Sequence, residues 1–179
     1  MIDKFKNFQA QIVPNPLSIE VVKAEGSYIY GKNKKYLDFV AGVSVCNIGH
    51  SNKKVFRAVS KQLKKYSHVM VYGEFIQEPS VNLCELLVKN LPDNLNSVYL
   101  TNSGTEAVEA ALKISKRITG RSKIVSAKNS YHGSTHGSLS VTGYESRKRA
   151  YRPLLPNIEY LEFNCDDLSV IDENTACVI

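Results

Sequence analysis

The sequence has 179 residues, of which 43% are hydrophobic and 22% charged, a composition typical of a globular protein and not of a disordered chain. Its formal net charge is +6, but the basic residues are scattered and lack interleaved aromatic residues, so a nucleic-acid partner is not indicated. No run of about 18 apolar residues is present, so neither a transmembrane helix nor a membrane partner is expected.

The cysteines and the N-terminal segment favour a reducing compartment. The four cysteines are widely spaced without a C-x-x-C pair, so neither a zinc site nor a thiol redox motif is indicated. Cys84 and Cys177 have apolar neighbours and are expected to be small core residues. No apolar stretch precedes a small-residue cleavage site, so we expect no secretory signal and a cytoplasmic location.

The first third of the chain predicts short strands and then helices. Residues 19–23, 27–30 and 36–40 are rich in β-formers and are separated by turn residues. Residues 52–66 have apolar side chains at helical spacing, and residues 78–91 lie between Pro79 near their start and Pro92 just beyond their end. We expect residues 1–50 to form a small accessory segment and residues 51–179 an incomplete cofactor-binding α/β domain.

From Ser97 onward, predicted strands and helices alternate. The strands are expected at 98–100, 123–127, 158–163 and 175–179, and the helices at 105–118 and 134–142. This alternation predicts an α/β fold with a mostly parallel sheet and helices on both faces. The last strand is apolar and ends without a polar tail, so we expect the chain to be a fragment or a truncated product.

A candidate anion site lies between residues 98–100 and the helix that follows. Ser103 and Glu106 form a capping-box pattern at the helix start, where backbone N–H groups have no partner within the helix. Gly104 has no side chain to block an anion, and the Ser103 and Thr105 hydroxyls are further donors. An ordinary helix cap is the alternative interpretation. On the same helix, Glu109 and Lys113 are expected to form an ion pair.

A second polar segment, residues 129–137, directly follows the strand expected at 123–127. Carboxyl ends of neighbouring parallel strands share one crevice, so Tyr131 would reach the space beside the phosphate and stack on a flat ring. A core or surface tyrosine is the alternative. His132 and His136 are four residues apart, but no H-E-x-x-H motif is present and Gly133 and Gly137 weaken the helix, so no metal site is predicted.

Taken together, these motifs resemble those of class III aminotransferases, a branch of the fold type I pyridoxal-phosphate enzymes. Five stretches match in order over nearly the whole chain: residues 24–28, 36–42, 47–50, 102–107 and 131–133. The resemblance implies pyridoxal 5'-phosphate as the cofactor, a fold type I large domain and a homodimer. It also implies a small-molecule amino donor and a 2-oxo acid acceptor as partners.

The resemblance also implies roles for individual residues. The Ser103 hydroxyl and the Gly104 and Thr105 backbone N–H groups would hold the cofactor phosphate. Tyr131 would stack on the pyridine ring, with His132 beside it.

Three further residues are implied on the substrate side. Val43 and Tyr72 would line the substrate entrance. Ser134 occupies the position where relatives acting on ornithine or acetylornithine tend to carry an arginine that pairs with a carboxylate.

The sequence departs from the family pattern at three places. Residues 31–35 replace a turn that usually contains Asp and Gly, and Ser51-Asn52 replaces His-Pro. The Schiff-base lysine and the aspartate for the pyridine nitrogen are expected beyond Ile179, so we predict no catalytic residue in this chain and no transamination by it alone. Lys128 is the best positional substitute, but it lacks the apolar or cationic surroundings that activate an amine.

For the intact protein we therefore predict amino transfer from an ω-amino acid or amine to a 2-oxo acid. An acetylornithine or ornithine aminotransferase and a glutamate-1-semialdehyde aminomutase are alternatives with the same cofactor. A non-catalytic anion-binding fragment is the alternative from another functional class.

Overall fold

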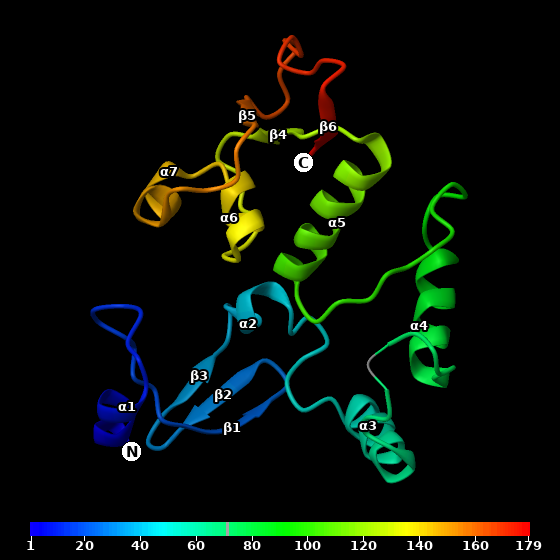
Figure 1. The fold of residues 1–179 in the computed structure, drawn as a ribbon. Coiled ribbons are helices and arrows are strands. Elements are labelled where there is room, and N and C mark those ends of the chain that lie inside the picture. The colour runs from blue at the N-terminus through cyan, green and yellow to red at the C-terminus, as the bar shows by residue number, and fades with distance from the viewer. Residues whose placement is uncertain (71) are drawn as a thin grey trace. The chain divides into compact units, whose positions relative to one another are not determined.

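Two compact units make up the chain in the computed structural model, which describes residues 1–70 and 72–179 (Figure 1). The first unit is Met1–Phe75 and the second is Ile76–Ile179. The sequence-based division after residue 50 stays a prediction about domain organisation. No helix in the described part of the chain is long and apolar enough to cross a bilayer.

A three-stranded antiparallel meander is the centre of Met1–Phe75. Its strands are β1 (Val21–Glu25), β2 (Tyr28–Gly31) and β3 (Lys35–Leu37), in the order β1-β2-β3. The three predicted strands are confirmed, with their ends shifted by up to three residues. Strand β3 ends before residue 40 because the Asp38 carboxylate accepts hydrogen bonds from the next backbone N–H groups, at Val40 and Ala41.

The described part of this unit also contains the helices α1 (Ile2–Phe8) and α3 (Lys53–Lys65), and the single turn α2 (Ala41–Ser44), whose φ angles are left-handed. The predicted helix 52–66 is confirmed as α3, and Asn52 caps it by accepting hydrogen bonds from the N–H groups of Lys54 and Val55. Sequence periodicity does not predict α1 or α2, which are both shorter than two turns.

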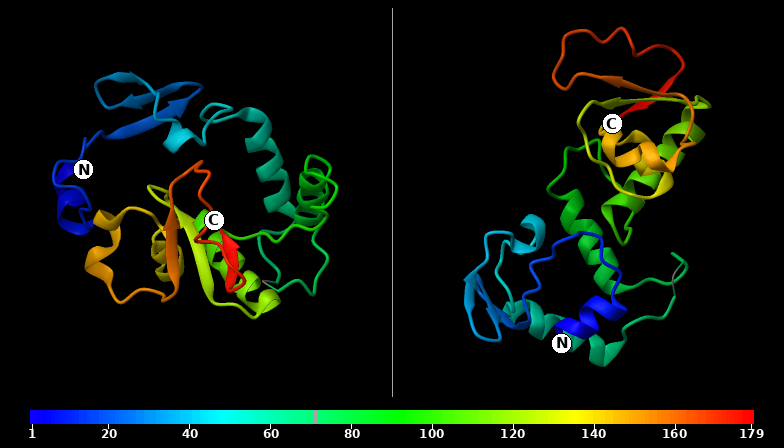
Figure 2. Two further views of the ribbon diagram at one scale, coloured as in Figure 1. Left: turned by 90° about the horizontal axis from the view of Figure 1, so that it is seen from above. Right: turned by 90° about the vertical axis from the view of Figure 1, so that its left-hand side faces the viewer.

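Ile76–Ile179 is built on a parallel sheet. The strands are β4 (Lys123–Ala127), β5 (Ile158–Leu161) and β6 (Thr175–Val178), with β4 in the middle (Figure 2). The helical segments are α4 (Glu78–Val88), α5 (Gly104–Thr119), α6 (His136–Val141), α7 (Glu145–Lys148) and the 3-10 turn η1 (Arg149–Tyr151). The predicted α/β fold with a parallel sheet and helices is confirmed.

Helices α5 and α6 pack against the same face of this sheet. Leu112 of α5, Ile124 of β4 and Val141 of α6 form its buried apolar cluster. Ser126, two residues after Ile124 and therefore on the same face, donates a 2.6 Å hydrogen bond to the Val141 carbonyl. A short turn joins the last residue of α5 to the first residue of β4, and the helix packs back along the sheet. The first residues of α5 therefore lie near the carboxyl end of β4.

The strand predicted at residues 98–100 is wrong. This segment has no strand assignment, and no described strand pairs with it. A strand requires a hydrogen-bonded neighbour, and residues 98–100 do not pair with either edge strand of the sheet, β5 or β6. Local apolar character alone therefore does not produce a strand here.

A buried lysine lies next to the sheet, although lysine is rarely buried without partners. The Lys148 side chain is only 4% exposed. Its ammonium group donates to the Thr142 carbonyl at 2.8 Å and to the Tyr160 hydroxyl, and it also lies over the Tyr160 ring. This one side chain thus joins the end of α6 to β5.

We predict that Lys148→Met lowers the free energy of unfolding by about 1–3 kcal/mol, because the buried Thr142 carbonyl loses its charged donor. Urea unfolding followed by circular dichroism measures this change. The matched control is Lys113→Met on the exposed side of α5, which should stay within about 0.5 kcal/mol of wild type. Equal effects of the two substitutions would contradict the role of Lys148.

Candidate functional site

The start of α5 has backbone donors that the protein itself does not use. In the described part of the chain, the N–H groups of Gly104 and Thr105 have no hydrogen-bond partner. The Ser103 hydroxyl accepts from the Glu106 N–H at 3.3 Å, so its own proton is free to be donated. A Cβ added to Gly104 would meet no atom within 4 Å, so the space beside these donors is open.

This cradle, residues 103–105, fits a phosphate group. Two N–H groups, one hydroxyl proton and the positive end of the helix dipole are the features that bind anions at helix starts. The Glu106 carboxylate reaches back to the Asn102 N–H at 2.8 Å, so the turn is held by a reciprocal pair of side-chain hydrogen bonds. The predicted helix start is confirmed, at Gly104 instead of Thr105.

The segment that follows β4 returns to this cradle. The Thr105 Oγ1 lies 2.7 Å from the Thr135 Oγ1 and 2.5 Å from the Ser138 Oγ. Gly133 comes so close that a Cβ added to it would lie 2.3 Å from the Thr105 Oγ1, and its φ of +132° also excludes most side chains. The structure therefore brings the cradle and the end of the 129–137 segment together, although they are some 30 residues apart in the sequence.

Tyr131 presents an exposed ring within the same segment. Its side chain is 59% exposed, and its hydroxyl lies 3.2 Å from the Ser134 Oγ. The Arg147 guanidinium carbon lies 5.4 Å from the centre of the ring, a cation–π contact. Sequence reasoning missed Arg147, whose only local signal is the basic run 147–149.

His132 is a half-buried residue of the same segment. Its Nε2 lies 3.4 Å from the Ser126 Oγ, and its backbone N–H donates to the Thr142 Oγ1 at 3.1 Å. Burial lowers the pKa of the His132 imidazole, so the ring is neutral at pH 7. His136, the other histidine considered, instead contacts the Pro153 carbonyl at 3.0 Å.

The two remaining predicted substrate residues belong to Met1–Phe75. Val43 is 81% exposed and Tyr72 is 70% exposed. Their roles at a substrate entrance stay predictions. Lys128, considered as a substitute nucleophile, forms an exposed ion pair with Glu162 at 2.6 Å.

Val43 lies in a strained turn that sequence periodicity does not reveal. Four consecutive residues, 41–44, have positive φ angles between 47° and 65°. Each non-glycine residue in this left-handed region costs about 1–2 kcal/mol. Asp38 holds the start of the turn, and its other carboxylate oxygen lies 2.7 Å from the His50 Nε2. The pKa of Asp38 lies below its usual range because of the His50 contact and the Ala41 and Val40 N–H groups.

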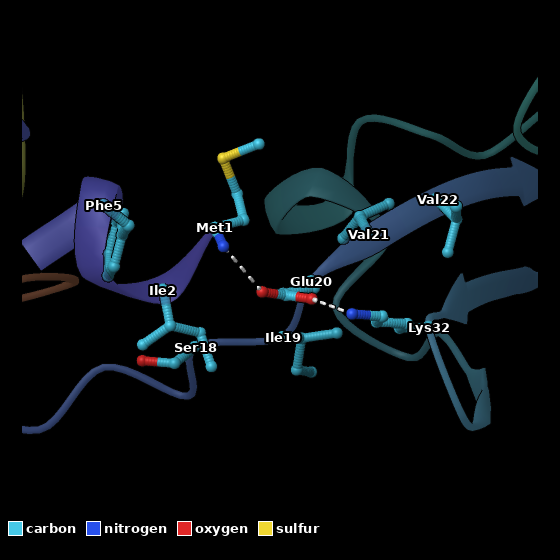
Figure 3. A pocket seen from close by; sticks show the side chains of 9 residues that line it. All are labelled: Met1, Ile2, Phe5, Ser18, Ile19, Glu20, Val21, Val22 and Lys32. Atoms are coloured by element: carbon cyan, nitrogen blue, oxygen red, sulfur yellow. Dashed lines mark ion pairs between the residues drawn. The ribbon is translucent and has the colours of Figure 1, made fainter.

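A cavity of about 540 Å³ lies in Met1–Phe75 (Figure 3). It has mostly apolar walls from α1 and β1, and its carboxylate, Glu20, is already paired with the Met1 amino group and Lys32. None of the predicted site residues lines this cavity. We therefore place the candidate site at the cradle.

Comparisons with known proteins agree with this geometry. A family model described as aminotransferase class-III matches residues 9–179. The chain is 40% identical over 167 residues to the [LysW]-aminoadipate semialdehyde/glutamate semialdehyde transaminase of Sulfurisphaera tokodaii, covering 90% of this chain and 42% of that protein. It is 40% identical over 164 residues to the acetylornithine aminotransferase of Archaeoglobus fulgidus, covering 90% of this chain and 43% of that protein.

Solved structures show the same likeness. The adenosylmethionine-8-amino-7-oxononanoate aminotransferase of Methanocaldococcus jannaschii superposes with a TM-score of 0.88 and 29% identity, over 98% of this chain and 45% of that one. The omega transaminase of Pseudomonas jessenii, solved in complex with PMP, gives 0.83 and 25%, over 90% and 39%. The chain thus spans less than half the length of these relatives.

We predict that NMR titration of His132 gives a pKa below the ordinary value of about 6.5. As the pH falls, the unfolded chain takes up this proton first. The contribution of His132 to stability is therefore present above about pH 6.5 and is lost as the pH falls through the folded pKa. His132→Gln assigns the signal among the four histidines and should remove this part of the pH dependence. A titration at or above 6.5 would contradict the burial argument.

Proposed function

The chain belongs to the class III aminotransferase family, and from this premise we propose that it forms the phosphate-binding part of a pyridoxal 5'-phosphate site. The observation that carries the proposal is the pair of unpartnered N–H groups at Gly104 and Thr105, next to a free Ser103 proton. The intact protein would move an amino group from an ω-amino acid or amine to a 2-oxo acid.

Each residue of the site has a part in this proposal. The cradle would bind and orient the phosphate through two backbone N–H groups and the Ser103 hydroxyl. The exposed Tyr131 ring would cover the pyridine ring. Neutral His132 would hold the segment against β4 through its contact with the Ser126 hydroxyl. When bound, pyridoxal 5'-phosphate supplies the electron sink for amino transfer. The homodimer and the cytoplasmic location stay predictions.

The donor class is inferred from Ser134. This serine is exposed, and its hydroxyl contacts Tyr131, whereas a carboxylate-binding site calls for the planar fork of an arginine. We therefore favour an amino donor that has a terminal amine and that needs no carboxylate-binding residue at position 134. Two relatives at 40% identity, however, are named acetylornithine aminotransferase and [LysW]-aminoadipate semialdehyde/glutamate semialdehyde transaminase. These names favour an acetylornithine-type enzyme as the second candidate.

We predict that Gly104→Ala weakens phosphate binding without unfolding the chain. The added methyl group meets no protein atom within 4 Å, so it stands in the open space where the phosphate would lie. Pyridoxine 5'-phosphate is a suitable probe, because its alcohol cannot form imines with the lysines. Calorimetry should show that wild type prefers this probe to pyridoxine and that the variant loses the preference.

The control for this experiment is Gly73→Ala, which also meets no atom within 4 Å. It should leave both binding and the circular dichroism spectrum unchanged. If wild type binds pyridoxine as well as pyridoxine 5'-phosphate, the cradle does not bind phosphate and the proposed function fails.

We predict that the protein expressed from its complete gene uses ω-amino acids and simple amines better than N-acetylornithine. A donor panel with one 2-oxo acid acceptor measures the preference as kcat/KM. If N-acetylornithine is much the best donor and Ser134→Arg leaves that preference unchanged, the inference from Ser134 fails. No turnover with any donor would support a non-catalytic anion-binding protein.

A further inference from the structure

Glu109 lies one helical turn after Thr105, and its carboxylate faces α6. Its Oε1 accepts three hydrogen bonds, from the Thr135 Oγ1 at 2.6 Å, the Gly137 N–H at 2.8 Å and the Ser138 N–H at 3.0 Å. The ion pair predicted with Lys113 is not among the described contacts of Glu109. The partners of Glu109 come instead from Thr135 and the first turn of α6. Backbone N–H groups at a helix start have no acceptor within the helix, so they are free to bind this carboxylate.

The Glu109 carboxylate fixes part of the proton arrangement in this network. Thr135 gives its hydroxyl proton to Glu109, so the Thr135 Oγ1 can only accept in its contacts with the Thr105 Oγ1 at 2.7 Å and the Ser138 Oγ at 2.9 Å. The Ser138 hydroxyl also lies 3.1 Å from the Thr135 carbonyl, to which it can donate, and 2.5 Å from the Thr105 Oγ1. The three hydroxyl groups thus form one cluster beside the Glu109 carboxylate.

This arrangement changes the role of Thr105 in the cradle. Its hydroxyl group is engaged by Thr135 and Ser138, so the donor that Thr105 offers to an anion is its backbone N–H. The free hydroxyl proton of the cradle belongs to Ser103, which accepts from the Glu106 N–H. The side chain of Thr105 therefore connects the cradle to the segment after β4.

The carboxylate of Glu109 remains ionised over a wide pH range. Burial acts to raise the pKa of Glu109, but the hydrogen bonds from Thr135, Ser138 and Gly137 outweigh it and hold the pKa below the usual range. Close approach is possible because residue 137 is glycine: a Cβ there would lie 2.2 Å from the Glu109 Oε2.

We propose that Glu109 is a positioning residue, which through Thr135 and the first turn of α6 holds residues 131–134 at the cradle and so presents the Tyr131 ring to the cofactor. This inference rests on the proposed function of the cradle. Glu109 touches neither the phosphate donors nor the Tyr131 ring directly. Its loss should therefore affect recognition of the pyridine ring and spare recognition of the phosphate.

The experiment compares two ligands on the full 179-residue chain, pyridoxine 5'-phosphate and inorganic phosphate, by ³¹P NMR titration. Glu109→Ala should weaken binding of pyridoxine 5'-phosphate about tenfold, by analogy with the loss of residues that orient metal ligands. Binding of inorganic phosphate should change less than about twofold, because the Gly104 and Thr105 N–H groups are intact. Glu109→Gln keeps an oxygen for the same three donors and should restore most of the affinity.

Gly137→Ala is a second variant that does not alter Glu109 itself. The methyl group displaces the flexible end of the Glu109 side chain and leaves the backbone in place, so the same selective loss is expected. Glu85→Ala is the matched control, since Glu85 forms an exposed ion pair with Lys89 on α4. It should change neither affinity.

The outcomes separate this inference from the proposed function. If wild type does not prefer pyridoxine 5'-phosphate to pyridoxine, the proposed function fails. If wild type has that preference but Glu109→Ala and Gly137→Ala bind pyridoxine 5'-phosphate as tightly as wild type does, the positioning role is wrong. An equal loss of both ligands in Glu109→Ala also overturns it, because Glu109 would then support the cradle and not the ring.

Discussion

The unpaired backbone N–H groups at the start of α5 are the constraint on which the candidate site depends. A helix start leaves N–H donors without partners, and side chains or ligands must satisfy them. Here Ser103 and Glu106 satisfy two nearby N–H groups, while those of Gly104 and Thr105 remain for an outside acceptor. The local sequence thus produces both the helix cap and the donors of the proposed phosphate site.

Polar contacts, and not apolar packing, fit the segment after β4 to this helix start. Hydrogen bonds are directional, so the chain from Ser138 through Thr105 and Thr135 to Glu109 defines both the distance and the orientation of the two elements. Apolar packing of α5 and α6 against β4 places the two helices side by side. The polar network determines which residue of the segment meets the cradle.

Backbone strain accompanies the predicted substrate-side residue Val43. Left-handed conformations in consecutive residues are unfavourable unless surrounding contacts hold them. In Met1–Phe75 the Asp38 carboxylate provides such contacts, and His50 orients it from the other side. Both residues lie in the sequence stretches that carry the family resemblance, 36–42 and 47–50.

Elements whose causes are local could be predicted from the residues alone. Periodicity and capping residues predicted α3 and α5, alternating α/β texture predicted the parallel sheet, and strand β4 was predicted with its correct ends. The Ser103 cap was also readable, because its partner Glu106 is three residues away. Short-range interactions of this kind depend only on residues that the sequence places side by side.

Features that depend on distant partners could be seen only in the folded protein. Residues 98–100 look like a strand but lack a neighbour to pair with. Glu109 has a possible helical partner in Lys113, yet its carboxylate binds the start of α6, where two backbone N–H groups and one hydroxyl outweigh one exposed ion pair. The burial of Lys148 likewise depends on Thr142 and Tyr160. In each case the deciding group comes from another element, and sequence spacing carries no information about which elements meet.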